Sequence, residues 1–255
     1  MHDKPDTLKS FAQIHADYAF FESHADESEA SLAAWLPLVR NRWPHLRALD
    51  FGSGSGSFSS TFLERAQFSP DQLDLTLVEP DQGFREQAIA RLTPFCARPI
   101  TAWPLLDRDI EPRFELIFSH HVLYYVPNLE ETLGRLHQGL VPGGRMLLVQ
   151  GGQGNGLNQL VMAAFAHLGS RPPYQYSEDT QSALQRLGIG YRLETVRSSL
   201  QFADSEAARW RILRFLLGEH LPRLEPDFAT ALFQPWLKGD QVRVDSADEL
   251  FIIDR

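Results

Sequence analysis

The segment over residues 46–58 constrains the fold of this chain more than any other. Its sequence, LRALDFGSGSGSF, is a short apolar run that leads into Gly52, Gly54 and Gly56 and then into a helical pattern. Glycine has no Cβ, so these positions can adopt positive φ angles and bring the backbone close to a ligand. The pattern predicts a buried strand, a tight loop and a helix, a unit at which α/β folds bind ligands.

The rest of the chain repeats this alternation. Short apolar runs that end in turn residues predict strands, and helical patterns separate them. We expect an α/β fold with a doubly wound, mostly parallel, Rossmann-like sheet of seven strands, at residues 47–51, 73–79, 98–103, 114–119, 145–150, 191–196 and 249–254. Helices are predicted at residues 58–66, 81–92, 129–140, 157–168, 178–187, 205–217 and 227–237.

The first 45 residues have a helical and acidic pattern of their own. Apolar residues recur at three- and four-residue steps over 11–21 and again over 32–39, which predicts two helices. Asp26 and Ser28 between them are residue types that cap helix N-termini. We expect a single domain over 1–255, with an N-terminal helical cap (1–45), a cofactor-binding core (46–150) and substrate-cap helices with the last two strands (151–255).

Composition narrows the class of function. The chain has 24 Lys and Arg against 33 Asp and Glu, and a net charge of −9 repels a nucleic-acid backbone. Its single cysteine, Cys96, has no partner for an internal disulfide, and the charged start of the chain does not read as a signal peptide. We therefore expect a cytoplasmic protein, a monomer or weak homodimer, with no nucleic-acid partner and no membrane span.

Two acidic residues indicate what the glycine loop binds. Asp50 precedes the loop, and Glu79 ends the next predicted strand, where a carboxylate can accept both hydroxyls of an adenosine ribose. That pair fits NAD and S-adenosylmethionine alike. The spacing G-x-G-x-G with an acid before it opposes a pyrophosphate, however, and suits the amino group at the cationic end of S-adenosylmethionine.

Three motifs resemble the class I S-adenosylmethionine-dependent methyltransferases. They are Gly52-Ser53-Gly54-Ser55-Gly56, Glu79-Pro80-Asp81 and Val141-Pro142-Gly143-Gly144-Arg145. The resemblance implies S-adenosylmethionine as cofactor and S-adenosylhomocysteine as product. It assigns cofactor contacts to Asp50, Gly52, Ser53, Gly54, Gly56, Glu79, Pro80 and Ser119. Many members have an acid after the third strand, where this chain has Trp103, which is expected either to stack on the purine or to belong to the core.

The region after the fourth predicted strand is expected to bind the methyl acceptor. The sequence Leu123-Tyr124-Tyr125-Val126 and several other patches resemble the histamine N-methyltransferase family. That resemblance implies a substrate carboxylate at Glu27 and a polar substrate contact at His121, where the family has glutamine. The acceptor site then comprises Tyr18, Phe21, Glu27, His121, Tyr124 and Tyr125, with Phe11 as a further ring, because aromatic faces and a carboxylate attract a cation.

Two further features of the sequence limit the predicted site. His120 and His121 lack a third ligand at a recognisable spacing, so no metal is expected. Near the C-terminus the family has an asparagine where this chain has Ala247-Asp248-Glu249. Asp248 either meets a second cationic group of the substrate or, as we expect, lies in a surface turn before the last strand.

The predicted function is S-adenosylmethionine-dependent methylation of a small molecule, most simply N-methylation of an amine or imidazole by in-line transfer. Glu27 would orient the acceptor and His121 would assist its deprotonation, so these are the candidate catalytic residues. Two alternatives stay open. One is O- or C-methylation of a natural product or carboxylate, and the other is a methyltransferase-like binding subunit without activity.

Overall fold

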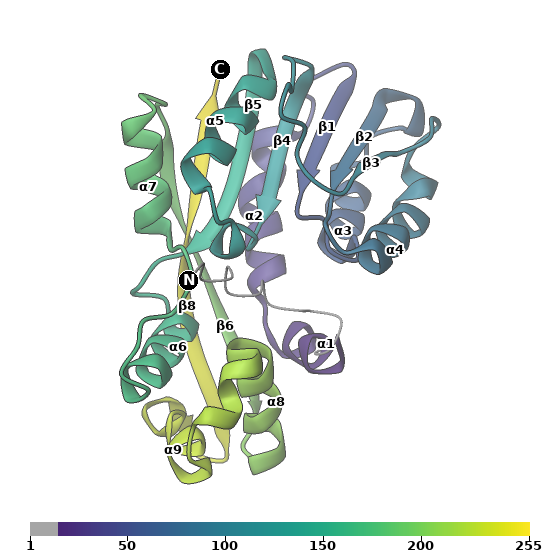
Figure 1. Ribbon diagram of the computed structural model, residues 1–255. Helices are drawn as coiled ribbons and strands as arrows, with labels where there is room; N and C mark the ends of the chain where they lie inside the picture. The colour runs from purple at the N-terminus through teal and green to yellow at the C-terminus, as the bar shows by residue number, and fades with distance from the viewer. Residues whose placement is uncertain (1–14) are drawn as a thin grey trace. The chain divides into compact units, whose positions relative to one another are not determined.

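The computed structural model describes residues 15–255 (Figure 1), which divide into two compact units. The core unit comprises residues 31–150, 175–195 and 249–255, and the helical unit comprises the described residues up to Ala30, with 151–174 and 196–248. Each unit is described by itself. Within residues 15–255 no helix is both long enough and apolar enough to cross a membrane.

Over these residues the strands form one eight-stranded sheet in the order β3-β2-β1-β4-β5-β8-β6, with the short β7 paired to β8. The strands are β1 (Leu46–Phe51), β2 (Leu73–Val78), β3 (Thr101–Trp103), β4 (Phe114–His120), β5 (Leu140–Gly151), β6 (Arg192–Ala203), β7 (Leu237–Lys238) and β8 (Gln241–Asp254). β1 pairs in parallel with both β2 and β4, and β4 with β5. The predicted doubly wound, mostly parallel sheet is confirmed, and β7 adds a two-residue hairpin strand to the seven expected.

The helices follow the predicted order. They are α1 (His15–His24), α2 (Glu27–Val39), α3 (Ser57–Ala66), α4 (Gln82–Leu92), α5 (Leu129–Gly139), α6 (Gly156–His167), α7 (Ser177–Arg186), α8 (Glu206–Leu217) and α9 (Pro226–Ala231). The helix predicted over 227–237 is wrong in its second half, where a 3-10 turn at Gln234–Trp236 replaces it. Pro235 has no backbone N–H to continue an α-helix there. Part of the helix predicted over 11–21, including Phe11, lies outside the described residues.

The core unit is organised around β1 and β4, which lie side by side in its sheet with β2 and β3 beyond β1 (Figure 1). Leu49, Ile117 and Phe251 are completely buried in its hydrophobic core. The strands β1, β2 and β4 therefore read as apolar runs because both faces are covered. Their carboxyl ends meet at one edge of the sheet, where open α/β folds bind ligands.

The opposite edge of the core unit is closed by charged and backbone contacts. The N–H of Gly143 donates to the carbonyl of Arg255 (2.7 Å), so the start of β5 meets the end of β8 and the two strands run antiparallel. Arg145 donates to both carboxylate oxygens of Asp254, at 2.7 and 2.9 Å, and to the carbonyl of Leu38 at 3.1 Å. This guanidinium holds the pKa of Asp254 below its usual value.

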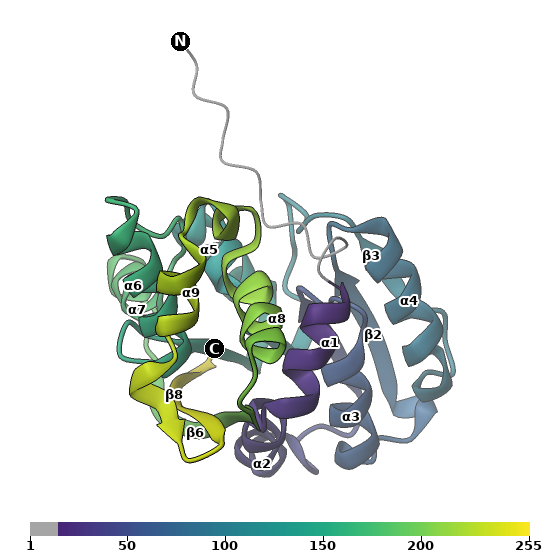
Figure 2. The same ribbon diagram turned by 90° about the horizontal axis from the view of Figure 1, so that it is seen from below.

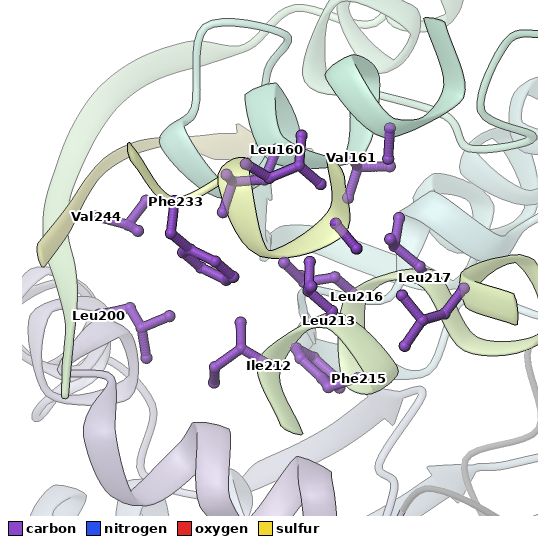
Figure 3. Close-up of a cluster of buried hydrophobic side chains, with 14 of the residues drawn as sticks. Leu160, Val161, Leu200, Ile212, Leu213, Phe215, Leu216, Leu217, Phe233 and Val244 are labelled. Carbon is purple, nitrogen blue, oxygen red and sulfur yellow. The ribbon is translucent and has the colours of Figure 1, made fainter. Parts of the chain in front are cut away.

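The helical unit has a separate hydrophobic core. Figure 3 shows side chains of α8 pointing towards Leu160 and Val161 of α6 and towards Phe233. The helix α1 lies beside α8 (Figure 2), and the ring of Phe21 stacks on that of Phe215 at 4.4 Å. The pairing buries Phe21, which is 2% exposed.

Candidate functional site

The three glycines after β1 all adopt positive φ angles, but they do so for different reasons. The φ angles are +80° at Gly52, +53° at Gly54 and +76° at Gly56. A Cβ on Gly52 would lie 2.4 Å from Val122, and one on Gly56 would lie 3.1 Å from Cα of Ala88 in α4. A Cβ on Gly54 would meet no described atom within 4 Å. The outer glycines therefore serve the packing of the protein, and Gly54 is the position at which a ligand can approach the backbone.

Glu79 faces this loop from the end of β2. Its Oε2 accepts a hydrogen bond from the N–H of Gly54 (2.9 Å), and its Oε1 accepts one from the N–H of Asp81 (2.9 Å). The side chain is 9% exposed, and burial raises its pKa. Each carboxylate oxygen can accept a further bond, so the pair of oxygens is fixed in a geometry suited to two adjacent hydroxyls.

Asp50 lies within β1 and is 3% exposed. The hydroxyl of Ser59 in α3 donates to its Oδ2. Burial raises the pKa of Asp50 to about 7, and the charge of Glu79 acts in the same direction. The loop is thus flanked by two carboxylates whose charged forms are disfavoured without a cationic partner.

We expect replacement of Asp50 by asparagine to stabilise the ligand-free protein at alkaline pH. The folded pKa lies near 7 and the ordinary value is 3.8, so the folded state binds this proton more tightly than the unfolded state does. Stability is then fully present below pH 3.8 and falls as the pH rises towards 7. The neutral amide avoids this loss, with a gain of about 1–3 kcal/mol in the free energy of unfolding at pH 8.

Urea unfolding of the two proteins at pH 4 and pH 8 tests this. The control is Asp71→Asn, which changes an exposed carboxylate in the same way. Parallel pH dependences for wild type and Asp50→Asn would show that the buried carboxyl does not carry the effect.

Ser53 supplies a further polar group in the loop. Its hydroxyl is buried and has no hydrogen-bond partner among residues 15–255. A buried polar atom without a partner in a folded protein calls for an explanation, and a bound ligand is one. The loop, the two carboxylates and this hydroxyl fit S-adenosylmethionine: Glu79 would hold the ribose, and Asp50 and Ser53 the charged methionine end.

The other predicted cofactor residues occupy varied environments. The hydroxyl of Ser119 donates to the carbonyl of Phe51 (2.8 Å) and so ties β4 to the end of β1. Pro80 is exposed, and its carbonyl accepts a bond from Arg85. The ring of Trp103 is half-buried, with the guanidinium of Arg113 at 5.9 Å from its centroid.

His121 follows β4 directly and has an unusual backbone. Its φ angle is +57°, in the left-handed region that few residues other than glycine adopt. Its N–H donates to the carbonyl of Val149 in β5 (3.0 Å), which pins the backbone. Its ring is parallel to that of Tyr124 at 6.2 Å, and the Tyr124 hydroxyl lies 3.5 Å from Nδ1. Strained residues that the surrounding structure fixes in this way cluster at functional sites.

His120, its neighbour, has a packing role. Its ring stacks on Phe58 at 3.9 Å, and its Nε2 lies 3.1 Å from the hydroxyl of Ser31. Burial lowers its pKa well below the ordinary value, so the ring stays neutral. Among residues 15–255 no group of three His, Cys, Asp or Glu side chains is placed to hold a metal ion.

The sequence analysis missed one aromatic residue beside Tyr124. The ring of Tyr176 lies edge-on to Tyr124 at 6.4 Å, and Tyr125 lies at 6.0 Å from the same ring. Tyr176 is 6% exposed and comes from the segment before α7. Its part in this cluster arises from the tertiary structure, and no local pattern marks it. We call His121, Tyr124, Tyr125 and Tyr176 the aromatic cluster.

Three predicted acceptor residues lie in the helical unit. Phe21 belongs to its core, Tyr18 is half-buried with its ring 5.3 Å from Phe215, and Glu27 is half-buried in the first turn of α2. The turn before Glu27 is held by Asp26, whose carboxylate accepts bonds from the N–H (2.5 Å) and hydroxyl (3.1 Å) of Ser199. Glu27 therefore follows a fixed point of this unit.

The expectation for Asp248 is wrong. The residue is 2% exposed and lies inside β8, which begins at Gln241 and not at residue 249. The side-chain amide of Asn155 donates to its Oδ1 (2.8 Å), while the Asn155 carbonyl oxygen caps α6 by accepting from the N–H of Leu157 (2.9 Å). Asp248 is thus part of a buried polar network and not a surface turn.

Comparisons with known proteins agree with this geometry. Residues 49–146 match the family model described as "Methyltransferase domain". The chain is 27% identical over 125 residues to a polyketide synthase-nonribosomal peptide synthetase of Aspergillus clavatus, a match that covers 47% of this chain and 3% of that protein. It is 28% identical over 176 residues to trans-aconitate 2-methyltransferase of Rhizobium leguminosarum bv. trifolii, covering 68% of this chain and 62% of that one. The chain thus spans less than two thirds of either relative.

A solved structure shares the fold over nearly the whole chain. Geranyl diphosphate C-methyltransferase from Streptomyces coelicolor A3(2), in complex with S-adenosyl-L-homocysteine, superposes with a TM-score of 0.54 at 14% identity, covering 99% of this chain and 86% of that one. None of these three proteins is a histamine N-methyltransferase. Residues 49–146 are thus similar to methyltransferase domains, the chain shares the fold of that methyltransferase, and its glycine loop has a geometry that fits S-adenosylmethionine.

Proposed function

We propose that this chain is an S-adenosylmethionine-dependent methyltransferase that methylates a nitrogen atom of a small amine or imidazole. The observation that supports this most directly is the pinned, strained backbone of His121, which fixes an imidazole beside the ring of Tyr124. Tyrosine faces attract ammonium and imidazolium groups. The net charge of −9 favours a cationic acceptor over an anionic one.

The chemistry divides between cofactor and protein. S-adenosylmethionine supplies a methyl group already activated on a sulfonium. The protein has to hold the acceptor nitrogen with its lone pair along the C–S axis, and such positioning is worth about 7–11 kcal/mol in favourable systems. A protonated amine has no free lone pair, so His121 would take the proton of the acceptor onto its ring before transfer.

A carboxylate and a further aromatic ring complete the residues proposed for the acceptor. Glu27 is proposed to orient a cationic acceptor, on the ground of the sequence resemblance and its place directly after the Asp26 anchor. Tyr18 is proposed as an aromatic face. The ring of Phe21 is covered by Phe215, so we assign it to the stability of this unit.

O- or C-methylation is the second candidate, and the named relatives favour it. One relative is a trans-aconitate methyltransferase and another a polyketide synthase hybrid. A carboxylate acceptor needs a cationic side chain, and the guanidinium of Arg145 is engaged by Asp254 and Leu38 at the opposite edge of the core unit. Asp50, Gly54 and Glu79, which we propose to bind the cofactor, are all present at the loop, and this argues against an inactive binding subunit.

Calorimetry followed by an acceptor panel distinguishes these functions. Binding of S-adenosylmethionine and S-adenosylhomocysteine is measured first. The protein is then incubated with amines, imidazoles, phenols, carboxylates and β-keto thioesters, and the methylated product is identified by mass spectrometry. N-methyl product supports the proposal, whereas methylation only at carboxylate oxygen or carbon overturns it in favour of the second candidate. Absence of cofactor binding would contradict both candidates.

A further inference from the structure

Gln150, at the end of β5, is a polar residue that the proposed chemistry does not use. It is completely buried, and both ends of its side-chain amide are bonded. Its Nε2 donates to the carbonyl of Gln175 (2.9 Å), and its Oε1 accepts from the hydroxyl of Thr180 (2.6 Å). Thr180 is also completely buried. One strand residue thus bonds both to Gln175, which precedes α7, and to Thr180 in the first turn of α7.

The same segment is bonded to the turn after β4. The N–H of Gln175 donates to the carbonyl of Tyr124 (3.0 Å), within the 3-10 turn Leu123–Tyr125. Gln175 is therefore held on its carbonyl side by Gln150 and on its N–H side by Tyr124. The next residue is Tyr176, whose ring meets the ring of Tyr124 edge-on, with 79° between the ring planes.

The ring of Tyr124 has both His121 and Tyr176 as neighbours. The ring of His121 is parallel to it, with 4° between the planes, and the ring of Tyr176 lies edge-on to it. A ring packed in this way keeps one rotamer, whereas a mobile neighbour would let it turn. The order of the aromatic cluster then depends on the segment before α7 staying in place.

We propose that Gln150 is a positioning residue for the acceptor site. Through Thr180 and Gln175 it holds Tyr176 and Tyr124 against His121, so that the imidazole presents one fixed orientation. An apolar side chain of the same size would leave the Gln175 carbonyl and the Thr180 hydroxyl without partners in a buried place. The effect of Gln150 on catalysis rests on the proposed function of His121, but its effect on the orientation of the rings is a property of the ligand-free protein.

The test is NMR spectroscopy of the full chain with 13C-labelled histidine. The ring signals of His121 are assigned by their loss in His121→Asn, and those of His45 serve as an internal reference because that ring lies outside the aromatic cluster, with its Nε2 at 2.8 Å from the carboxylate of Asp74. In Gln150→Met and in Thr180→Val we expect the His121 signals to shift or split into a second set while the His45 signals stay unchanged. The control is Gln185→Met, which removes an exposed amide from α7, the helix that contains Thr180. Its His121 signals should match those of the wild type.

Each outcome decides the matter. Unchanged His121 signals in folded Gln150→Met or Thr180→Val overturn the proposal, and so do His45 signals that move as much as those of His121, because that pattern indicates general loosening. Thr180→Val is nearly isosteric and removes a single bond, so it keeps the test valid if Gln150→Met does not fold. The histidine signals are measured without cofactor or acceptor. In a separate calorimetric measurement, the affinity of the variants for S-adenosylmethionine should stay within about twofold of that of the wild type. If the proposed function is wrong, the His121 signals of the variants can therefore still be interpreted.

Discussion

Gly54→Asn is expected to bind S-adenosylmethionine at least about 100-fold more weakly than the wild type, a loss of roughly 3 kcal/mol, while remaining folded. Asparagine tolerates the left-handed region better than other side chains, so the φ of +53° costs little. No described atom lies within 4 Å of the new Cβ, so the fold accepts the side chain. The side chain would instead fill the place at which the cofactor has to approach the backbone.

The neighbouring glycine provides the matched control. In Gly56→Ala the added Cβ meets the backbone of α4 at 3.1 Å, so this variant should lose about 1–3 kcal/mol of unfolding free energy through overpacking and backbone strain. Calorimetry with S-adenosylmethionine and urea unfolding, applied to both variants, separate the two effects. A Gly54→Asn protein that binds the cofactor as wild type does would remove Gly54 from the cofactor site.

This contrast shows what the sequence could and could not predict about the loop. The alternation of glycines after an apolar run predicted a strand, a loop with positive φ and a helix, and the structure confirms each. The pattern treats the three glycines as equivalent. Their different roles depend on Val122 and Ala88, which are distant in sequence and reach the loop only in the folded chain.

The strand β8 is longer than the sequence pattern predicted. Apolar density predicted a strand over 249–254, but the structure extends it back to Gln241. Val242, Val244, Ser246 and Asp248 all point to the buried side, with a period of two that was present in the sequence. Two of these four residues are polar, so the apolar residues alone do not reveal the alternation. The buried bond from Asn155 explains how Asp248 is accommodated.

Residues fixed by tertiary contacts had no local signal at all. Gln150 lies at the end of an apolar strand as many polar residues do, and Tyr176 precedes an ordinary amphipathic helix. Only the fold brings the segment before α7 to the ends of β4 and β5. The sequence therefore predicted the glycine loop, which a contiguous motif builds, better than the aromatic cluster, which separate segments assemble.

The second large effect is expected at His121. In His121→Asn the kcat/KM for the nitrogen acceptor found in the panel should fall by about 10²–10⁴, the usual contribution of a positioned acid–base group. Asparagine retains the left-handed backbone and its bond to Val149, so the cluster should stay folded while the group that takes the proton is lost. The affinity for S-adenosylmethionine should change by less than about twofold, because the loss concerns the acceptor and not the cofactor.

The control for this variant is His137→Asn. His137 lies in the last turn of α5, where burial and the charge of Arg255 lower its pKa, so it is a partly buried histidine outside the aromatic cluster. It should retain wild-type turnover. Turnover by folded His121→Asn within a fewfold of wild type would show that the acceptor arrives already deprotonated. His121 would then act only by shape and hydrogen bonding, and the aromatic cluster would position the acceptor without moving its proton.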